Sequence, residues 1–327
     1  MQENKLRPSA RVYNLFLILA SFVFAIGPSA AQERSLERSA GQDWTIEKSD
    51  GRLVFRDGKQ QIAVFHYRDS ECLRPFFSEV RTFSGQSITR NYPPVTGVDP
   101  DDHASMHGGI WLAFGDINGE DFWRNKGQIQ HRRFIQEPVA NAEGISFACE
   151  DALIDSMGKA IGMIDQSYRI RRIRFGYALD WTAMIRANSG PLALGDQEEM
   201  GLGVRVSTSM TEKNGGKIQS STGAISAKQT WGKIAAWSDY SKLTDGKRLG
   251  VLLQPHENNI KPSWFHNRDY GLMVANCFGS KSFTGGEPSS IKIAAGETLK
   301  IAYRVFWYEC EATDEPPIDA FAGEAQP

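Results

Sequence analysis

Two short blocks of the sequence combine histidines with carboxylates, arginines and aromatic residues. The first block, residues 102–132, contains His103, His107, His131, Asp116, Glu120, Asp121, Trp111 and Trp123. The second block, residues 256–271, contains His256, His266, Trp264, Arg268, Asp269 and Tyr270. Histidine beside a carboxylate can transfer protons near neutral pH, and indole rings with arginine suit the faces and hydroxyls of a sugar. The blocks therefore predict a site where loops and strand ends converge.

Other interpretations of these blocks compete with that one. His103 and His107 could bind a metal, with His131 or Asp116 as a third ligand. Their spacing would place both rings on one face of a helix, but Gly108-Gly109 and nearby prolines predict a loop instead. The aromatic residues could also fill a core while the polar groups satisfy buried backbone. No serine-esterase elbow, phosphate loop or dinucleotide fingerprint supports those chemistries.

The N-terminus predicts a secretory signal peptide over residues 1–31. Basic residues at positions 5, 7 and 11 precede an apolar run at 13–26 that is too short to span a membrane, and small residues follow at 29–31. Cleavage would leave a polar segment, 32–42, that we expect to be disordered. The expected location is periplasmic or secreted, with no membrane association after cleavage.

Charge and length narrow the class of protein further. The full chain has a net charge of −2, and loss of residues 1–31 removes three basic residues and one acidic residue, giving −4. A mildly acidic surface of this kind does not fit a nucleic-acid partner. Residues 43–311 are long enough for one large domain, followed by a tail at 312–327. In an oxidising compartment, Cys72, Cys149, Cys277 and Cys310 could form one or two disulfides or remain buried as small apolar residues.

Short apolar runs separated by turn residues predict an all-β fold. Asp50-Gly51 and Asp57-Gly58 separate the first three runs and are strong hairpin signals. A further strand is predicted at 79–83, and prolines at 93, 94 and 100 predict a long loop leading to the first block. No long segment has a helical period. We therefore expect an antiparallel β-sandwich with few short helices.

The runs MHGGIWLAFGDINGEDFWRNKGQIQH, RPFFSEVRTFSGQSITRNYPP, WSDY and WFHNRDYGLMVANCFG together resemble the secreted PmoA-like family of bacterial proteins. The resemblance covers residues 44–309 and departs at Gly108, where many relatives have proline. Its "methane oxygenase" label looks like a misnomer, because methane oxygenase subunits span membranes several times. The resemblance implies a domain of unknown function with a galactose-mutarotase-like supersandwich and a carbohydrate-facing groove. The matching positions are Arg74, His103, His107, Trp111, Asp116, Asp121, Trp123, His131, His266, Arg268, Asp269 and Tyr270.

The residue chemistry then suggests roles that the resemblance does not supply. We expect His107 and His266 to transfer protons, with Asp116 and Asp269 as their carboxylate partners. Arg74 and Arg268 would hold hydroxyl or carboxylate groups, and Trp111 or Trp123 would stack on a sugar ring; His103, Asp121, His131 and Tyr270 complete the predicted substrate-binding set. The predicted function is cleavage, elimination or epimerisation of a glycoside or sugar derivative. The alternatives are a non-catalytic glycan-binding module and a metal-dependent enzyme that uses His103 and His107.

Overall fold

The computed structural model describes residues 44–314, and these residues form two large antiparallel sheets with a small third sheet. The predicted signal peptide, the segment 32–42 and most of the tail at 312–327 lie outside the described residues. The described chain belongs to one compact unit, Gln42–Pro327. The predicted all-β, antiparallel sandwich is confirmed. None of the described helices is long and apolar enough to span a membrane.

The first sheet has nine strands among the described residues. In spatial order they are β1 (Trp44–Ser49), β2 (Arg52–Asp57), β3 (Gln60–His66), β4 (Phe76–Ser78), β5 (Ile110–Phe114), β11 (Met200–Arg205), β17 (Leu272–Asn276), β16 (Trp264–Asn267) and β13 (Lys233–Ile234). The Asp-Gly turns join β1, β2 and β3 as predicted. The strand predicted at 79–83 is shorter and earlier, because Glu79 adopts a φ of 49°, a left-handed conformation outside the β region.

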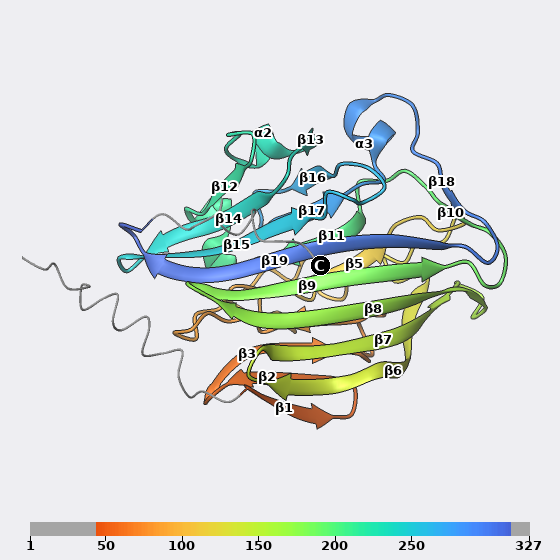
Figure 1. Cartoon of the computed structure of the whole chain (residues 1–327). Helices are drawn as coiled ribbons and strands as arrows, with labels where there is room; N and C mark the ends of the chain where they lie inside the picture. The colour runs from red at the N-terminus through yellow and green to blue at the C-terminus, as the bar shows by residue number, and fades with distance from the viewer. Residues whose placement is uncertain (1–43, 315–327) are drawn as a thin grey trace, which may run out of the picture. The chain divides into compact units, whose positions relative to one another are not determined.

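The second sheet has eight described strands, several of them long. In spatial order they are β12 (Lys217–Ser220), β14 (Ser238–Thr244), β15 (Lys247–Pro255), β19 (Thr298–Glu311), β9 (Gly176–Arg186), β8 (Ala160–Ile173), β7 (Gly144–Ile154) and β6 (Gln128–Asn141). Figure 1 shows this sheet in front, with β11, β16 and β17 of the first sheet behind it. The remaining strands, β10 (Leu192–Leu194) and β18 (Ile291–Ile293), pair with each other. The described helices are η1 (Thr208–Met210), η2 (Glu212–Asn214), α2 (Ala227–Thr230) and α3 (Ser280–Thr284).

The main hydrophobic core lies between the two large sheets. Aromatic rings of β3 and β4 meet rings of β7, β8 and β9 there: Phe65 lies 4.9 Å from Phe147 and 5.0 Å from Tyr168, and Phe77 lies 5.6 Å from Trp181 (centroid distances). Side chains alternate along each strand, so every second residue faces this core. All four cysteines are buried free thiols.

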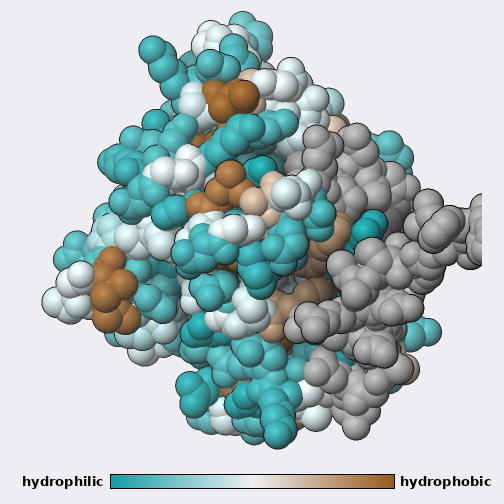
Figure 2. All heavy atoms as spheres, turned by 90° about the vertical axis from the view of Figure 1, so that its left-hand side faces the viewer, coloured by the Kyte–Doolittle hydropathy of each residue, from teal (hydrophilic) through white to brown (hydrophobic). Residues whose placement is uncertain are grey.

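A second apolar cluster lies on the other side of the nine-stranded sheet. On β5, Ile110 and Leu112 belong to the main core, whereas Trp111 belongs to this outer cluster with Leu272 and Val274 of β17. Loops can pack on this outer face of the sheet because Trp111 and its neighbours cover it. Elsewhere, exposed hydrophobic residues are scattered: the face in Figure 2 shows them as small separate patches among hydrophilic residues.

Candidate functional site

A stack of aromatic rings rises from the outer side of β5. The ring of His107 lies 4.8 Å from the indole of Trp111 at an interplanar angle of 15°, and the ring of His103 stacks on His107 at 4.7 Å. Trp123 meets Trp111 edge-on at 5.3 Å. Trp111 is held there because its neighbours on β5 pack into the main core. The chain reverses after His103, which places both histidines above one strand.

His103 and Asp102 form the accessible pair at the top of this stack. His103 Nδ1 lies 3.0 Å from an Asp102 carboxylate oxygen, and the His103 side chain is 43% exposed. Burial opposes ionisation of Asp102, but hydrogen bonds from Arg205 and His103 hold the pKa of its carboxyl below its usual range. His103 has a φ of 54°, and such a conformation in a residue other than glycine often marks a functional position. With Nδ1 facing Asp102, the Nε2 edge of His103 is left for other partners.

Within residues 44–314, three nitrogen atoms beneath this pair are buried and have no hydrogen-bond partner: His107 Nδ1, Trp111 Nε1 and Arg205 Nη1. Buried polar groups normally have partners, so each marks a place where a further polar atom would be stabilised. Burial, followed by the nearby His103, lowers the pKa of His107 well below its usual value, so this ring is neutral at physiological pH.

The second block reaches the same side of the sheet through β16. His266 Nε2 accepts a hydrogen bond from Arg268 Nε at 2.8 Å, and His266 Nδ1 lies 3.4 Å from both the backbone oxygen and a carboxylate oxygen of Glu198. Arg268 also donates to the Glu198 carboxylate at 3.1 Å. Burial, and then the Arg268 charge, lower the pKa of His266 to about 3. Both ring nitrogens of this neutral histidine are therefore engaged.

Two contacts join the blocks. Arg124, in the first block, donates to the carboxylates of Glu199 at 2.7 Å and Asp121 at 2.9 Å. Glu199 follows Glu198, which contacts the second block, so this bond connects the two blocks indirectly. Tyr270, from the second block, lies 6.3 Å from the His103 ring, and the Arg205 guanidinium lies 4.6 Å from the Tyr270 ring centroid.

We call the assembled group the sheet-face cluster; its members are Asp102, His103, His107, Trp111, Asp121, Trp123, Arg124, Glu198, Glu199, Arg205, His266, Arg268 and Tyr270. Two of its charged groups are open to solvent, because the Arg124 and Arg268 side chains are 40% and 42% exposed, whereas Arg205 is buried. Asp102, Arg124, Glu198, Glu199 and Arg205 were not predicted as site residues. The sequence signal for them was that Glu198-Glu199 directly precede a predicted strand. That signal does not show which residues the two side chains contact.

Four predicted site residues lie apart from the exposed part of this cluster. Arg74 is buried and donates to the backbone oxygen of Trp123, so it supports the cluster from below. His131 pairs with Asp151 in the other sheet at 3.1 Å. Asp116 caps its own turn through the Gly119 N–H at 2.8 Å, and Asp269 lies 3.8 Å from Lys213.

The expected carboxylate partners therefore differ from those in the structure. His266 has Glu198 rather than Asp269, and none of the contacts within residues 44–314 joins Asp116 to His107. The reason is local: both aspartates follow the end of a strand, where turn geometry directs their side chains. Proton transfer by His107 and His266 stays a prediction.

A metal site at His103 and His107 was the other expectation for this region. Within the described part of the chain, no group of three or more histidine, cysteine, aspartate or glutamate side chains is placed to hold a metal ion. The two imidazoles stack with an interplanar angle of 20°, so their in-plane lone pairs run nearly parallel and do not converge on one point.

The sequence match to known families covers most of the chain: the model of one family of unknown function matches residues 52–320. The chain belongs to the DUF6807 family. No curated protein matches it. The match to DUF6807 does not test the resemblance to the PmoA-like family, which stays a prediction.

Several solved structures are similar to this DUF6807 chain at low sequence identity. A galactose mutarotase-like protein from Lactobacillus casei ATCC 334 is 8% identical with a TM-score of 0.34, covering 81% of this chain and 100% of its own. A galactose mutarotase related enzyme from Lactobacillus acidophilus is 8% identical with a TM-score of 0.31, covering 83% and 99%. The GH36 alpha-galactosidase AgaA from Geobacillus stearothermophilus is 12% identical with a TM-score of 0.35, covering 82% and 40%.

Proposed function

We propose that this DUF6807 protein binds a carbohydrate at the sheet-face cluster and acts on it by acid–base chemistry. The observation that carries the proposal is the meeting of two distant sequence blocks, with the His103–His107–Trp111 stack and the His266–Glu198–Arg268 network on one side of one sheet. Solvent-exposed arginine and carboxylate groups beside aromatic rings are the groups that bind sugar hydroxyls and ring faces.

The aromatic surface available to a sugar differs from the one expected. Trp111 and Trp123 are 0% and 1% exposed, so a sugar ring cannot stack on them; they support the histidine stack instead. Tyr270 and Trp231 are partly exposed. The Arg268 guanidinium lies 5.8 Å from the Trp231 ring centroid, so Arg268 and this ring can contact the same ligand. We therefore assign the stacking role to Tyr270 and Trp231.

For proton transfer, the geometry favours His103. A carboxylate that holds Nδ1 of an imidazole fixes the tautomer and directs Nε2 to the substrate, as in other acid–base sites. Asp102 has this relation to His103, and Arg205 donates to Asp102 at 2.8 Å, which fixes the carboxylate. Cleavage, elimination and epimerisation all need such a group. We further propose a periplasmic or secreted location, on the basis of the signal peptide that residues 1–31 predict.

The test compares variants of the mature protein on a panel of glycosides and oxidised sugars. His103→Ala should lower turnover by about 10²-fold or more, the usual contribution of a positioned acid–base group. His256→Ala is the matched control, because His256 lies after β15 of the other sheet, where its N–H donates to Ala302, and turnover should be unchanged. Full turnover in the His103→Ala variant would remove His103 from the mechanism, and full turnover in a His103→Ala, His107→Ala, His266→Ala variant would refute acid–base chemistry at this cluster.

A non-catalytic glycan-binding module is the second candidate, and the engagement of both nitrogens of His266 favours it. A fully bonded imidazole orders Arg268 and Glu198 for binding without transferring a proton. This function predicts saturable sugar affinity and no product. Arg268→Ala should weaken affinity about tenfold under either function, because a charge-assisted hydrogen bond is lost. If no glycan binds on an array, or if binding survives Arg268→Ala and Glu198→Gln together, neither function holds at this cluster.

A further inference from the structure

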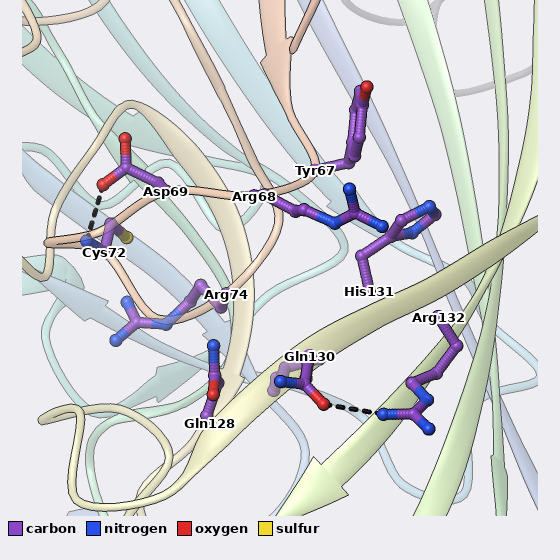
Figure 3. Close-up of a pocket in the computed structure, with 10 residues that line it drawn as sticks. Tyr67, Arg68, Asp69, Cys72, Arg74, Gln128, Gln130, His131 and Arg132 are labelled. Carbon is purple, nitrogen blue, oxygen red and sulfur yellow. Dashed lines mark hydrogen bonds between the residues drawn. The ribbon is translucent and has the colours of Figure 1, made fainter. Parts of the chain in front are cut away.

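A pocket of about 420 Å³ lies where the segment after β3 meets the beginning of β6, outside the exposed part of the sheet-face cluster. Its lining comes from two stretches: Tyr67, Arg68, Asp69, Cys72 and Arg74 from the β3–β4 connection, and Gln128, Ile129, Gln130, His131 and Arg132 from β6 (Figure 3). We call it the edge pocket, because β6 is the last strand of its sheet. Its lining is mostly polar, with three guanidinium groups.

The charge of the edge pocket is not balanced by its own carboxylate. Asp69 is the one acidic residue in the lining, and its Oδ1 atom already accepts hydrogen bonds from the Cys72 N–H at 2.8 Å and the Tyr92 hydroxyl. Arg132 donates to the neutral Gln130 side chain at 2.8 Å, and Arg68 has its carboxylate partner, Asp50, at 3.7 Å. The pocket therefore presents a net positive charge to a ligand.

His131 enters the edge pocket with a fixed orientation. Its Nδ1 lies 3.1 Å from Asp151, Gln166 donates to the other Asp151 oxygen at 2.8 Å, and Trp181 donates to Gln166 at 3.0 Å. This chain of buried polar groups leaves the Nε2 edge of His131 for the pocket. In Figure 3 the side chains of Arg68 and His131 point toward one another, whereas the guanidinium of Arg74 points away.

We propose that the edge pocket binds a small molecule through a carboxylate or phosphate group held by Arg68 and the Nε2 edge of His131, with Arg132 adding positive charge to the lining. Guanidinium groups form short, charge-assisted hydrogen bonds with such oxyanions, and a polar hollow of this volume accommodates a sugar-sized ligand. Cys72 takes no part as a nucleophile, because burial raises the pKa of its thiol to about 11. This proposal does not depend on the function assigned to the sheet-face cluster.

The test is isothermal titration calorimetry of the mature protein at low ionic strength with glucuronate, glucose and inorganic phosphate. Glucuronate should bind, and Arg68→Gln with Arg132→Gln should weaken its binding about tenfold or more, since a charge-assisted hydrogen bond and a second positive charge are lost. Phosphate that displaces glucuronate indicates a site for oxyanions in general; phosphate that does not displace it indicates a site for acidic sugars. Arg169→Gln is the control, because Arg169 is exposed on β8 and paired with Glu143 at 3.0 Å.

The two proposals fail separately in this design. Arg268→Ala should leave the oxyanion affinity of the edge pocket unchanged while weakening binding at the sheet-face cluster. Neutral glucose should show no dependence on Arg68 and Arg132. The proposal is overturned if the wild-type protein binds neither glucuronate nor phosphate, or if the double arginine variant, with an unchanged melting temperature, binds them as tightly as the wild type.

Discussion

Arg74 shows how a single buried residue determines the geometry of the candidate site. Its guanidinium donates to the Met106 backbone oxygen at 2.6 Å, to the Asn125 side chain at 2.7 Å and to the backbone oxygen of Trp123. Burial lowers its pKa from the usual arginine value, but the group remains charged. The sequence pointed to Arg74 as a ligand-binding residue; in the structure it positions the loop that carries His107 and the turn between β5 and β6 that carries Trp123.

We predict that Arg74→Met lowers the free energy of unfolding by about 3 kcal/mol, because one buried and two partly buried acceptors lose a charged donor. Arg68→Met, on the same connection, is the matched control: Arg68 is exposed, and its change should be within about 0.5 kcal/mol. Denaturant unfolding measures both. Equal small effects in the two variants would show that the Met106, Trp123 and Asn125 acceptors find other donors.

At the scale of elements, the close approach of β4 and β5 determines where the segment before β5 lies, and this segment carries His107. Gly109 directly precedes β5 and has a φ of 145°, and a Cβ atom there would lie 2.1 Å from the backbone oxygen of Phe77. Its own carbonyl accepts from the Arg205 N–H at 2.7 Å. Only glycine permits this approach, so the position of His107 depends on it.

Gly109→Ala should therefore destabilise the protein by about 3 kcal/mol or more, through backbone strain and a forced separation of β4 and β5. Gly97→Ala is the control: Gly97 has a φ of 80° but no atom within 4 Å of the added carbon, so only about 1 kcal/mol is expected. Thermal unfolding of the two variants decides the point. Similar losses would mean that φ alone, and not the contact with Phe77, determines the cost.

The first hairpins were predictable at this scale because Asp-Gly turns determine a local conformation without help from the rest of the chain. β4 was not predictable with the same accuracy. Its three residues stop at Ser78 because Glu79 takes a left-handed conformation, and beyond it Arg81 pairs locally with Ser87 through an isolated bridge. Such a conformation depends on tertiary contacts that no local pattern records.

At the scale of the whole molecule, the eight-stranded sheet carries a buried acid that makes stability depend on pH. Asp239 of β14 is 3% exposed and accepts a hydrogen bond from the Tyr308 hydroxyl of β19 at 2.9 Å. Burial raises the pKa of its carboxyl to about 6 from the usual 3.8. The folded state therefore holds this proton more tightly than the unfolded state, and stability from this group is lost as pH rises from about 4 to 6.

Asp239→Asn should remove this pH dependence, because asparagine is neutral throughout and keeps an acceptor for Tyr308. Relative to the wild type, the variant should gain up to roughly 3 kcal/mol between pH 4 and pH 7, from a shift of about two pKa units. Asp245→Asn, in the exposed turn after β14, should show no such trend. Unfolding curves over this pH range give the result. A constant difference between variant and wild type would show that Asp239 remains ionised in the folded protein.

The sequence alone determined the all-β class, the opening hairpins and the two blocks that carry the candidate chemistry, because alternation, turn residues and residue type are local properties. It also indicated His103, His107, Arg268 and Tyr270. Tertiary structure alone decided that Glu198, rather than Asp269, meets His266, and that His131 lies at a separate pocket. The physical reason is that partners across a sheet are set by strand order and register, here the placement of β11 between β5 and β17, which arise from packing over the whole chain.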